Sequence, residues 1–304
     1  FERMGCHGCH KVEGLDTLRK VGPDLRKINA KLTPEWVYKW IRNPKDFRKH
    51  TKMPRFFNLS NTNDEASIKR AETEIHAITA YLYGNSQTDS YAAAPAGSAA
   101  KGKMLFEDLG CMGCHTLGAE DKPSDWDYRS RGPNLSGLGS KVNARWLFAW
   151  LKNPKAYFPG TVMPNLRLSD AEAANVAAFL LTSKNEAFDR EAVPALDEAA
   201  LDQIMFEQNE SQMLVQEAKD KVAKTPLEEK KLAVGQRLVA HYGCFGCHEI
   251  SGFEKANRIG TELSDHGRKK MEQFEFGFVD IPRTRWDWFA QKLKDPRIFD
   301  EGHV

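Results

Sequence analysis

The six cysteines are the residues whose spacing indicates chemistry most directly. They form three pairs, each pair encloses two residues, and a histidine follows each pair at once. This pattern is typical of c-type haem attachment, in which two thiols bind the vinyl groups of one porphyrin and the histidine ligates its iron. We therefore predict three covalently attached haem groups. The predicted attachment sites are Cys6 and Cys9, Cys111 and Cys114, and Cys244 and Cys247, and the predicted proximal iron ligands are His10, His115 and His248.

Two other kinds of site use closely spaced cysteines. A lone Cys-x-x-Cys pair can be a thioredoxin-type redox centre or half of a zinc site. Histidine makes up only 9 of the 304 residues, so three pairs that each precede a histidine by chance are expected on the order of once in tens of thousands of cases. A zinc site would also require the pairs to meet each other. The repeated pattern therefore favours haem.

A glycine and a turn residue follow each motif histidine at some distance. Pro23 follows His10 and Pro133 follows His115, whereas the third copy has Thr261 at this place. Proline has a fixed φ and no N–H, so its carbonyl can be held toward the Nδ1–H of a proximal histidine and set the tautomer. A plain turn is the alternative. We predict that Pro23 and Pro133 support haem binding in their own copies, and that Thr261 departs from the pattern.

A tryptophan-bearing helix comes next in each copy. It is predicted over residues 36–43, 146–153 and 288–295. Trp36 and Trp146 each have a second tryptophan four residues later, so both rings of a pair lie on one helix face and are expected to pack on a porphyrin. Trp36 and Trp146 are therefore predicted cofactor-binding residues.

Two methionines recur at the same offset from these helices. Met53 stands ten residues after Asn43, and Met163 stands ten residues after Asn153. A methionine is usually a filler of the core, but a thioether at a repeated place in a haem module points to distal iron ligation. We predict Met53 and Met163 as distal ligands. In the third copy, ten residues after Asp295 is position 305, so we expect the given sequence to stop short of that distal ligand. His303 is a weaker candidate for the same role.

The elements around these residues are helical. Apolar residues at helical spacing predict helices over 101–109, 65–83 and from about 227 onward, and a capped helix that starts near Ser169. Each module is thus expected to be all-α, with a core that the porphyrin completes. Phe1 aligns with Phe106 in mid-helix, so we expect residues to precede Phe1. The predicted arrangement is three tandem modules at residues 1–84, 101–185 and 229–304.

Two linkers separate the predicted modules. Residues 85–100 are rich in alanine and predict a flexible tether. Residues 186–228 predict an acidic helical linker with one helix over 197–224, either solvated and packed on its neighbours or used as a dock for a partner. The formal net charge of the chain is only +2, and no run of about 18 apolar residues occurs. Composition therefore argues against nucleic acid as a partner and against a membrane span within this chain.

Each module resembles class I cytochrome c, the mitochondrial type. The whole is similar to a tandem triheme cytochrome c of the kind found in bacterial respiratory complexes, over residues 1–84, 100–184 and 230–304. The resemblance implies an electron carrier and not an enzyme, located in the periplasm or elsewhere outside the cytoplasm. Its expected partners are redox proteins, above all other subunits of a membrane respiratory complex or a quinol-linked donor.

A haem enzyme is the alternative function. A peroxidase or an oxyanion-converting enzyme would use an open or differently ligated third haem, with Glu301 and His303 as candidate acid and base groups. Binding of carbon monoxide by the reduced protein separates the two hypotheses, because an iron with both axial positions filled binds almost none.

Overall fold

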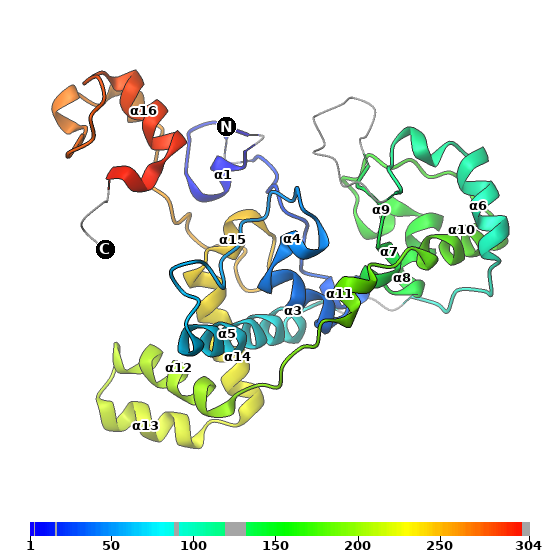
Figure 1. Cartoon of the computed structure of the whole chain (residues 1–304), viewed down its shortest axis with the longest axis horizontal. Coiled ribbons are helices and arrows are strands. Elements are labelled where there is room, and N and C mark those ends of the chain that lie inside the picture. The colour runs from blue at the N-terminus through cyan, green and yellow to red at the C-terminus, as the bar shows by residue number, and fades with distance from the viewer. Residues whose placement is uncertain (3, 16, 88–90, 119–131, 300–304) are drawn as a thin grey trace. The chain divides into compact units, whose positions relative to one another are not determined.

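The computed structural model describes residues 1–304 except residues 3, 16, 88–90, 119–131 and 300–304 (Figure 1). The regular secondary structure of the described part is helical, apart from one isolated antiparallel bridge between Leu32 and Val142. The predicted all-α class is therefore confirmed. No helix among the described residues combines the length and the apolar character needed to cross a bilayer.

The helices divide into those of three sequence regions. The first region holds α1 (Cys6–Cys9), α2 (Ile28–Lys31), α3 (Pro34–Arg42), α4 (Pro44–Phe47) and α5 (Glu65–Gly84). The second holds α6 (Ala99–Asp108), η1 (Cys111–Gly113), α7 (Leu138–Lys141), α8 (Ala144–Lys152), α9 (Pro154–Tyr157), α10 (Asp170–Thr182) and α11 (Glu186–Arg190). The third holds α12 (Glu198–Glu210), α13 (Val215–Lys224), α14 (Leu227–His241), α15 (Cys244–Cys247), η2 (His266–Arg268), η3 (Met271–Gln273), α16 (Arg285–Lys294) and η4 (Pro296–Phe299).

The chain folds into two compact units. Unit 1 comprises residues 1–21 and 257–304, and unit 2 comprises residues 22–256. The predicted module at 101–185 lies wholly within unit 2, but the unit boundaries cut through the predicted modules at 1–84 and 229–304. The first cysteine motif thus shares a unit with the end of the third repeat, while the third motif shares a unit with most of the first.

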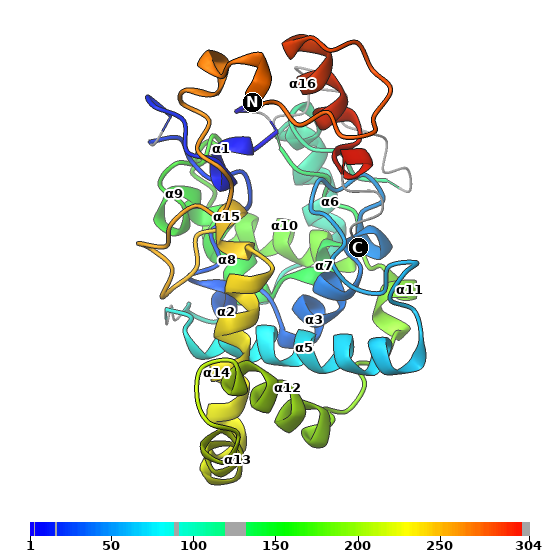
Figure 2. The same ribbon diagram turned by 90° about the vertical axis from the view of Figure 1, so that its left-hand side faces the viewer.

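One core of unit 2 forms where α14 crosses α5, as Figures 1 and 2 both show. Asp64 caps α5 by accepting a hydrogen bond from the backbone N–H of Ser67. The side chains that α5 and α14 bury against each other include Ile75, Ile78, Val234, Leu238 and Val239, all at most 4% exposed. Helix α14, the first helix of the third repeat, therefore packs into a core whose other helices come from the first repeat and from the acidic linker.

The second core of unit 2 has the same construction within a single repeat. Helix α6 packs on α10, and Phe106, Val176 and Leu180 are buried between the elements of this core. The capping box predicted at the start of α10 is present, because Ser169 and Glu172 exchange side-chain and backbone hydrogen bonds. The predicted helices over 65–83 and 101–109 are also confirmed within one or two residues.

The acidic linker folds as more than one helix. The helix predicted over 197–224 is in fact two, α12 and α13, separated by a turn at residues 211–214 and packed on each other. Leu201, Ile204 and Met205 of α12 are buried against α5 and α14, whereas Leu214 and Val215 are exposed. The apolar pattern therefore changes face at the turn. Helix α12 joins the core through these three residues, and α13 joins it through Val222.

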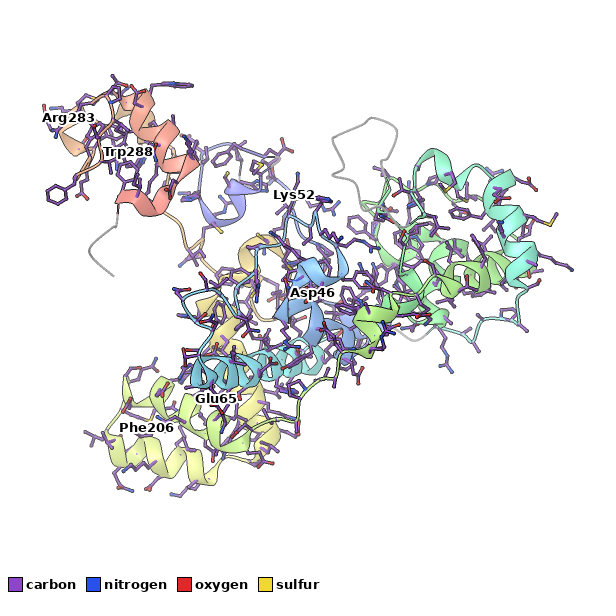
Figure 3. All side chains as sticks on the ribbon, in the orientation of Figure 1. Asp46, Lys52, Glu65, Phe206, Arg283 and Trp288 are labelled. Atoms are coloured by element: carbon purple, nitrogen blue, oxygen red, sulfur yellow. The ribbon has the colours of Figure 1, made fainter. Side chains whose placement is uncertain are left out.

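Unit 1 is held by one aromatic cluster. Phe274, Trp288 and Phe289 pack with ring centroids 5.1–5.6 Å apart, and His266 lies at their edge. Trp288, which lies on α16 (Figure 3), also donates from its indole N–H to the carbonyl of Glu275 at 2.9 Å. This cluster fixes α16 relative to the loop that contacts the first cysteine motif.

Candidate haem-binding sites

The three cysteine motifs form similar short turns, which are α-helical in α1 and α15 and 3-10 in η1. Each begins after a glycine in the left-handed region, with φ of 76° at Gly5, 71° at Gly110 and 65° at Gly243, where a side chain would be strained. The backbone N–H of each motif histidine then donates to the carbonyl of the first cysteine at 2.8–3.0 Å. One turn therefore carries both cysteines and ends at the histidine, as attachment of a single porphyrin edge requires.

Each motif histidine has a backbone carbonyl as partner for its ring. His115 Nδ1 donates to the carbonyl of Pro133 at 2.8 Å. This is the hydrogen bond predicted from the sequence, and it leaves Nε2 with its lone pair free for a metal. His248 and His10 make the same kind of bond, at 2.9 and 2.8 Å.

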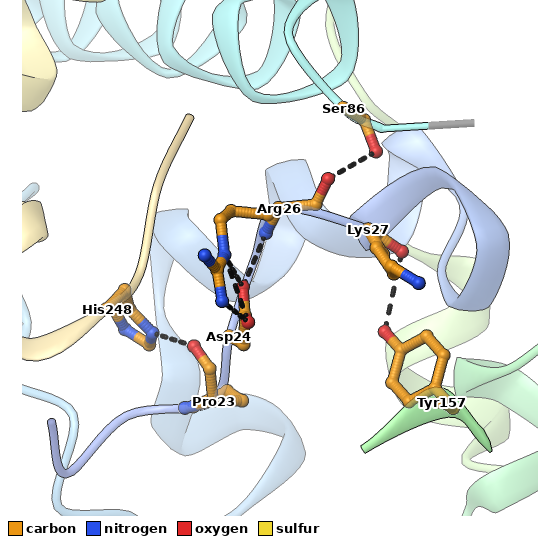
Figure 4. A network of polar contacts seen from close by, with 7 residues as sticks. All are labelled: Pro23, Asp24, Arg26, Lys27, Ser86, Tyr157 and His248. Atoms are coloured by element: carbon orange, nitrogen blue, oxygen red, sulfur yellow. Dashed lines mark hydrogen bonds and ion pairs between the residues drawn. The ribbon is translucent and has the colours of Figure 1, made fainter. Parts of the chain in front are cut away.

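The partners of His248 and His10 differ from those that the order of the repeats predicts. His248 donates to Pro23 of the first repeat (Figure 4), and His10 donates to Thr261 of the third. Pro23 therefore supports the third motif and not its own. Thr261 serves as well as a proline because the bond needs only a backbone carbonyl, which every residue has.

A glycine next to each carbonyl makes room for the histidine ring. A Cβ added at Gly22 would lie 2.5 Å from the ring of His248, and one added at Gly132 would lie 2.4 Å from the ring of His115. At Gly260 the distance to the ring of His10 would be 2.6 Å. These distances are too short for any real contact, so glycine is required at all three places.

The predicted distal methionines each lie beside a tryptophan. Trp40 donates from Nε1 to the sulfur of Met53 at 2.9 Å, and Trp150 donates to the sulfur of Met163 at 3.0 Å. The ring stacks of Trp36 on Trp40 and of Trp146 on Trp150 have centroids 5.1 and 5.4 Å apart. The sequence pattern predicts only a packing role for the second tryptophan of each pair. Both tryptophans stand 13 residues before a methionine, and this repeated distance is the sequence signal for the further contact.

Buried indole groups provide a test of whether haem fits these sites. The Nε1 groups of Trp36 and Trp146 are buried and find no acceptor among the described residues. Lys31 lies over the ring of Trp146 at 4.4 Å, and Lys141 lies over the ring of Trp36 at 5.0 Å. The two indole N–H groups and the two lysine amines have no carboxylate partner among the described residues. Such surroundings suit an anionic group, and haem carries propionates. The donor set and these surroundings therefore fit the cofactor.

The thiols do not have the properties of a redox dithiol. A thioredoxin-type centre needs a cysteine whose pKa is lowered. Burial instead raises the pKa of Cys9 and of Cys111, and it raises the pKa of Cys244 to about 11. Thiols of this kind are poor nucleophiles for disulfide exchange, which disfavours the redox alternative. Glu301 and His303, the candidate acid and base groups, lie outside the described residues.

Comparison with known proteins agrees with this geometry. The family model described as cytochrome c matches residues 99–184. Cytochrome c of Guizotia abyssinica is 35% identical over 118 residues, which covers 31% of this chain and 97% of that protein. Cytochrome c of Nigella damascena is 32% identical over 118 residues, with the same coverage.

A third relative is larger. Cytochrome c oxidase subunit 2 of Bacillus subtilis is 30% identical over 98 residues, which covers 29% of this chain and 27% of that subunit. A relative at 35% identity that the chain covers almost completely establishes the family, and the family implies covalently bound haem c and a role in electron transfer. The chain belongs to the cytochrome c family.

Proposed function

We propose that the chain carries three c-type haems and transfers electrons between a respiratory or quinol-linked donor and an acceptor outside the cytoplasm. The observation that carries the proposal is the threefold recurrence of one arrangement: two cysteines on a turn, a histidine that donates from Nδ1 to a carbonyl, and a glycine against the ring. Haem c, when bound, accepts and releases one electron by a change in iron valence. The chain's own residues hold and tune it.

The proximal side is prepared by hydrogen bonds to the histidines. Since Nδ1–H of His10, His115 and His248 is taken by a carbonyl, Nε2 is the nitrogen that can ligate iron. The acceptor carbonyl also fixes the plane of each ring. His10, His115 and His248 are accordingly the proposed proximal ligands, and the six cysteines are the proposed attachment sites.

Met53 and Met163 are the proposed distal ligands of two haems. The hydrogen bonds from Trp40 and Trp150 orient the two sulfurs and withdraw electron density from them. A weaker sulfur donor favours ferrous over ferric iron, so these tryptophans are expected to raise the reduction potential. With both axial positions filled, an iron exchanges electrons and does not bind a substrate.

The two cores of unit 2 are joined by contacts that cross over. Lys31 of the first repeat lies on Trp146 of the second, and Lys141 of the second lies on Trp36 of the first. The backbone N–H of Asn143 also donates to the carbonyl of Lys31 at 3.1 Å. Equivalent residues thus meet in both directions, as in a two-fold interface. A fixed junction between two haem sites supports electron exchange within unit 2.

The charge pattern supports a protein partner. Residues 186–230 carry 12 acidic and 5 basic side chains, whereas residues 1–90 carry 16 basic and 11 acidic ones. Opposite charges on different parts of one chain can orient different redox partners. The proposed partners are subunits of a membrane respiratory complex.

Mass spectrometry and a redox titration test this proposal. The purified protein should show the mass of three haem additions and take up three electrons per chain. The Cys111→Ala, Cys114→Ala double variant should lose one haem and one electron. A wild-type protein with one haem, or with haem that takes up no electron over the range of a respiratory chain, would contradict the proposal.

A further inference from the structure

We infer that Met53 ligates the haem attached at Cys244 and Cys247, and not the haem attached at Cys6 and Cys9. The first and third repeats exchange their second halves within one chain, so that the third motif uses the tryptophan helix and methionine loop of the first repeat. This inference rests on the proposed function and adds to it the assignment of a ligand across repeats.

Backbone hydrogen bonds show the same pairing in all three sites. In the second repeat, the N–H groups of Gly132 and Leu135 donate to the carbonyls of Cys114 and Thr116 at 2.9 and 2.8 Å. The equivalent residues of the first repeat, Gly22 and Leu25, donate to Cys247 and Glu249 of the third at 2.8 and 2.9 Å. Those of the third repeat, Gly260 and Leu263, donate to Cys9 and Lys11 of the first at 2.7 and 2.8 Å. The exchange therefore keeps both of these backbone bonds and the histidine bond at all three sites.

The helix packing around the third motif is in the same register as in the second repeat. Gly102 and Gly235 each stand nine residues before the first cysteine of a motif. A Cβ at Gly102 would meet the carbonyl of Asn175 and the Cβ of Phe179, and one at Gly235 would meet the carbonyl of Ala77 and the Cβ of Tyr81. Each glycine thus faces a backbone carbonyl and the side chain four residues after it on the partner helix. Helix α14 therefore occupies on α5 the place that α6 occupies on α10.

Polar contacts fasten the third repeat to α5 as well. The hydroxyl of Tyr242 donates to the carboxylate of Glu74, which is only 5% exposed and also pairs with Arg70 at 2.9 Å. The hydroxyl of Tyr81 donates to the carbonyl of Ser251 at 2.9 Å. A buried carboxylate without these partners would be costly, so they make the pairing specific.

The methionine loop of the first repeat closes on the third motif. Phe57, four residues after Met53, packs on Tyr242 with ring centroids 4.9 Å apart, and Tyr242 lies two residues before Cys244. Trp40, which donates to the sulfur of Met53, belongs to the same hydrophobic core as Cys244. The indole that binds the thioether of Met53 thus shares one core with the third motif. In the second repeat, Met163 and Cys111 share one core in the same way.

The first motif has a different environment in unit 1. Lys11 pairs with Glu262 at 3.4 Å, and the N–H of Glu13 donates to the hydroxyl of Ser264 at 2.9 Å. Lys292 stands at the place that corresponds to Trp40, so unit 1 has no indole in the role of Trp40. The two methionines in the described part of unit 1, Met4 and Met271, are exposed. The haem at Cys6 and Cys9 is therefore assigned no ligand from Met53.

Removal of one haem at a time tests the assignment. In reduced protein, each iron-bound methionine gives a strongly shifted methyl resonance in the proton NMR spectrum, so Met53 and Met163 should each contribute one. The Cys244→Ala, Cys247→Ala variant should lose the resonance of Met53 and keep that of Met163, and Met53→Ala should change nothing further in that background. The Cys6→Ala, Cys9→Ala variant should keep both resonances, and Met53→Ala should then remove one.

Met163→Ala is the matched control, because it should remove one resonance in either background. The opposite dependence, in which loss of Cys6 and Cys9 removes the Met53 signal and loss of Cys244 and Cys247 does not, overturns the inference. Failure of the proposed function is distinct, since it would appear as fewer than three haem additions in the wild-type mass.

A second measurement does not depend on the folding of haem-deficient variants. Zero-length carbodiimide coupling of the wild-type protein should join Lys11 to Glu262 within one chain. Equal mixing of isotopically light and heavy protein before coupling identifies the chain of origin. Absence of this link, or a link found only between light and heavy chains, would overturn an exchange within one chain, and Lys11→Arg should abolish the product.

Discussion

The cysteine motifs at residues 111–115 and 244–248 end in the same histidine–carbonyl hydrogen bond, but the carbonyl comes from different distances along the chain. His115 takes its carbonyl from Pro133, 18 residues away, whereas His248 takes its carbonyl from Pro23, 225 residues away. By the logarithmic dependence on loop length, the longer closure costs about 2 kcal/mol more. Burial of each large apolar side chain of α14, such as Leu238, contributes about 1.5–3 kcal/mol. Complementary halves, and not nearness in sequence, therefore decide which parts assemble.

The largest expected effect comes from a methyl group added where α14 packs on α5, or where α6 packs on α10. Gly235→Ala would place its Cβ 2.1 Å from the carbonyl of Ala77, and Gly102→Ala would place one 1.8 Å from the carbonyl of Asn175. Alanine favours a helix over glycine by about 1 kcal/mol, but overpacking against backbone costs about 1–3 kcal/mol. We expect net destabilisation, measured by chemical denaturation.

Hydrogen exchange locates that effect. Gly235→Ala should speed amide exchange in α5 and leave α10 unchanged, and Gly102→Ala should do the reverse. Gly267→Ala in unit 1 is the control, because its Cβ meets nothing within 4 Å. Faster exchange in α10 on substitution of Gly235 would contradict the described pairing of α14 with α5.

A smaller effect is expected from the tryptophans beside the methionines. Trp40→Phe and Trp150→Phe each remove one hydrogen bond to sulfur, worth about 0.5–1.5 kcal/mol. The freed sulfur is a stronger donor and stabilises ferric iron. Each substitution should therefore lower one reduction potential by about 20–60 mV, converted at 59 mV per tenfold change, in a potentiometric titration.

Lys292→Gln is the matched control for the tryptophan variants, because Lys292 occupies the corresponding place in unit 1. It should leave both methionine-linked potentials where they are. A rise in potential on loss of either indole would show that the tryptophan does not weaken the sulfur donor.

A pH dependence of stability is also expected in unit 2. Burial lowers the pKa of Lys31 to about 8 and, together with the charges of Lys31 and Arg48, that of Lys141 to about 7. In the unfolded chain both lysines titrate near 10.5. The unfolded state therefore binds more protons in this window, so stability rises from about pH 7 to about pH 10 and is lost as the pH falls.

Urea denaturation at about pH 7 and about pH 9.5 measures this dependence. The Lys31→Met, Lys141→Met double variant should have a flatter profile than the wild type, whereas Lys101→Met on the exposed side of α6 should keep the wild-type slope. Equal slopes for the double variant and the wild type would show that bound carboxylates hold both lysines charged.

Most of the local structure could be predicted from the sequence. The helix at 65–83, the capping box at Ser169 and the side-chain cap of Thr33 on α3 follow from apolar spacing and end-capping chemistry, and the structure has them. The hydrogen bond between His115 and Pro133 was also predictable, because its partners lie in one repeat. These features depend on short-range geometry alone.

The exchange of halves could not be predicted from the same pattern. Because the repeats have equivalent glycines, histidines and helix faces, the pattern shows which halves are compatible but not which of the compatible halves meet. The choice depends on particular side chains such as Tyr242 and Glu74, whose contact no periodicity reveals. The break between α12 and α13 could not be predicted either, because the turn at 211–214 contains neither glycine nor proline to mark it.

The position of α12 means that the polypeptide can be cut without being taken apart. The segment between α11 and α12 is the covalent path from the first two repeats to the third, yet α12 and α14 also lie against α5 from the far side of that segment. A nick there would leave two polypeptides. One would carry α5 and the other would carry the third cysteine motif, and the packing of α12 and α14 on α5 would keep the two associated. At this place the packing of the core, and not the peptide bond, holds the two parts together.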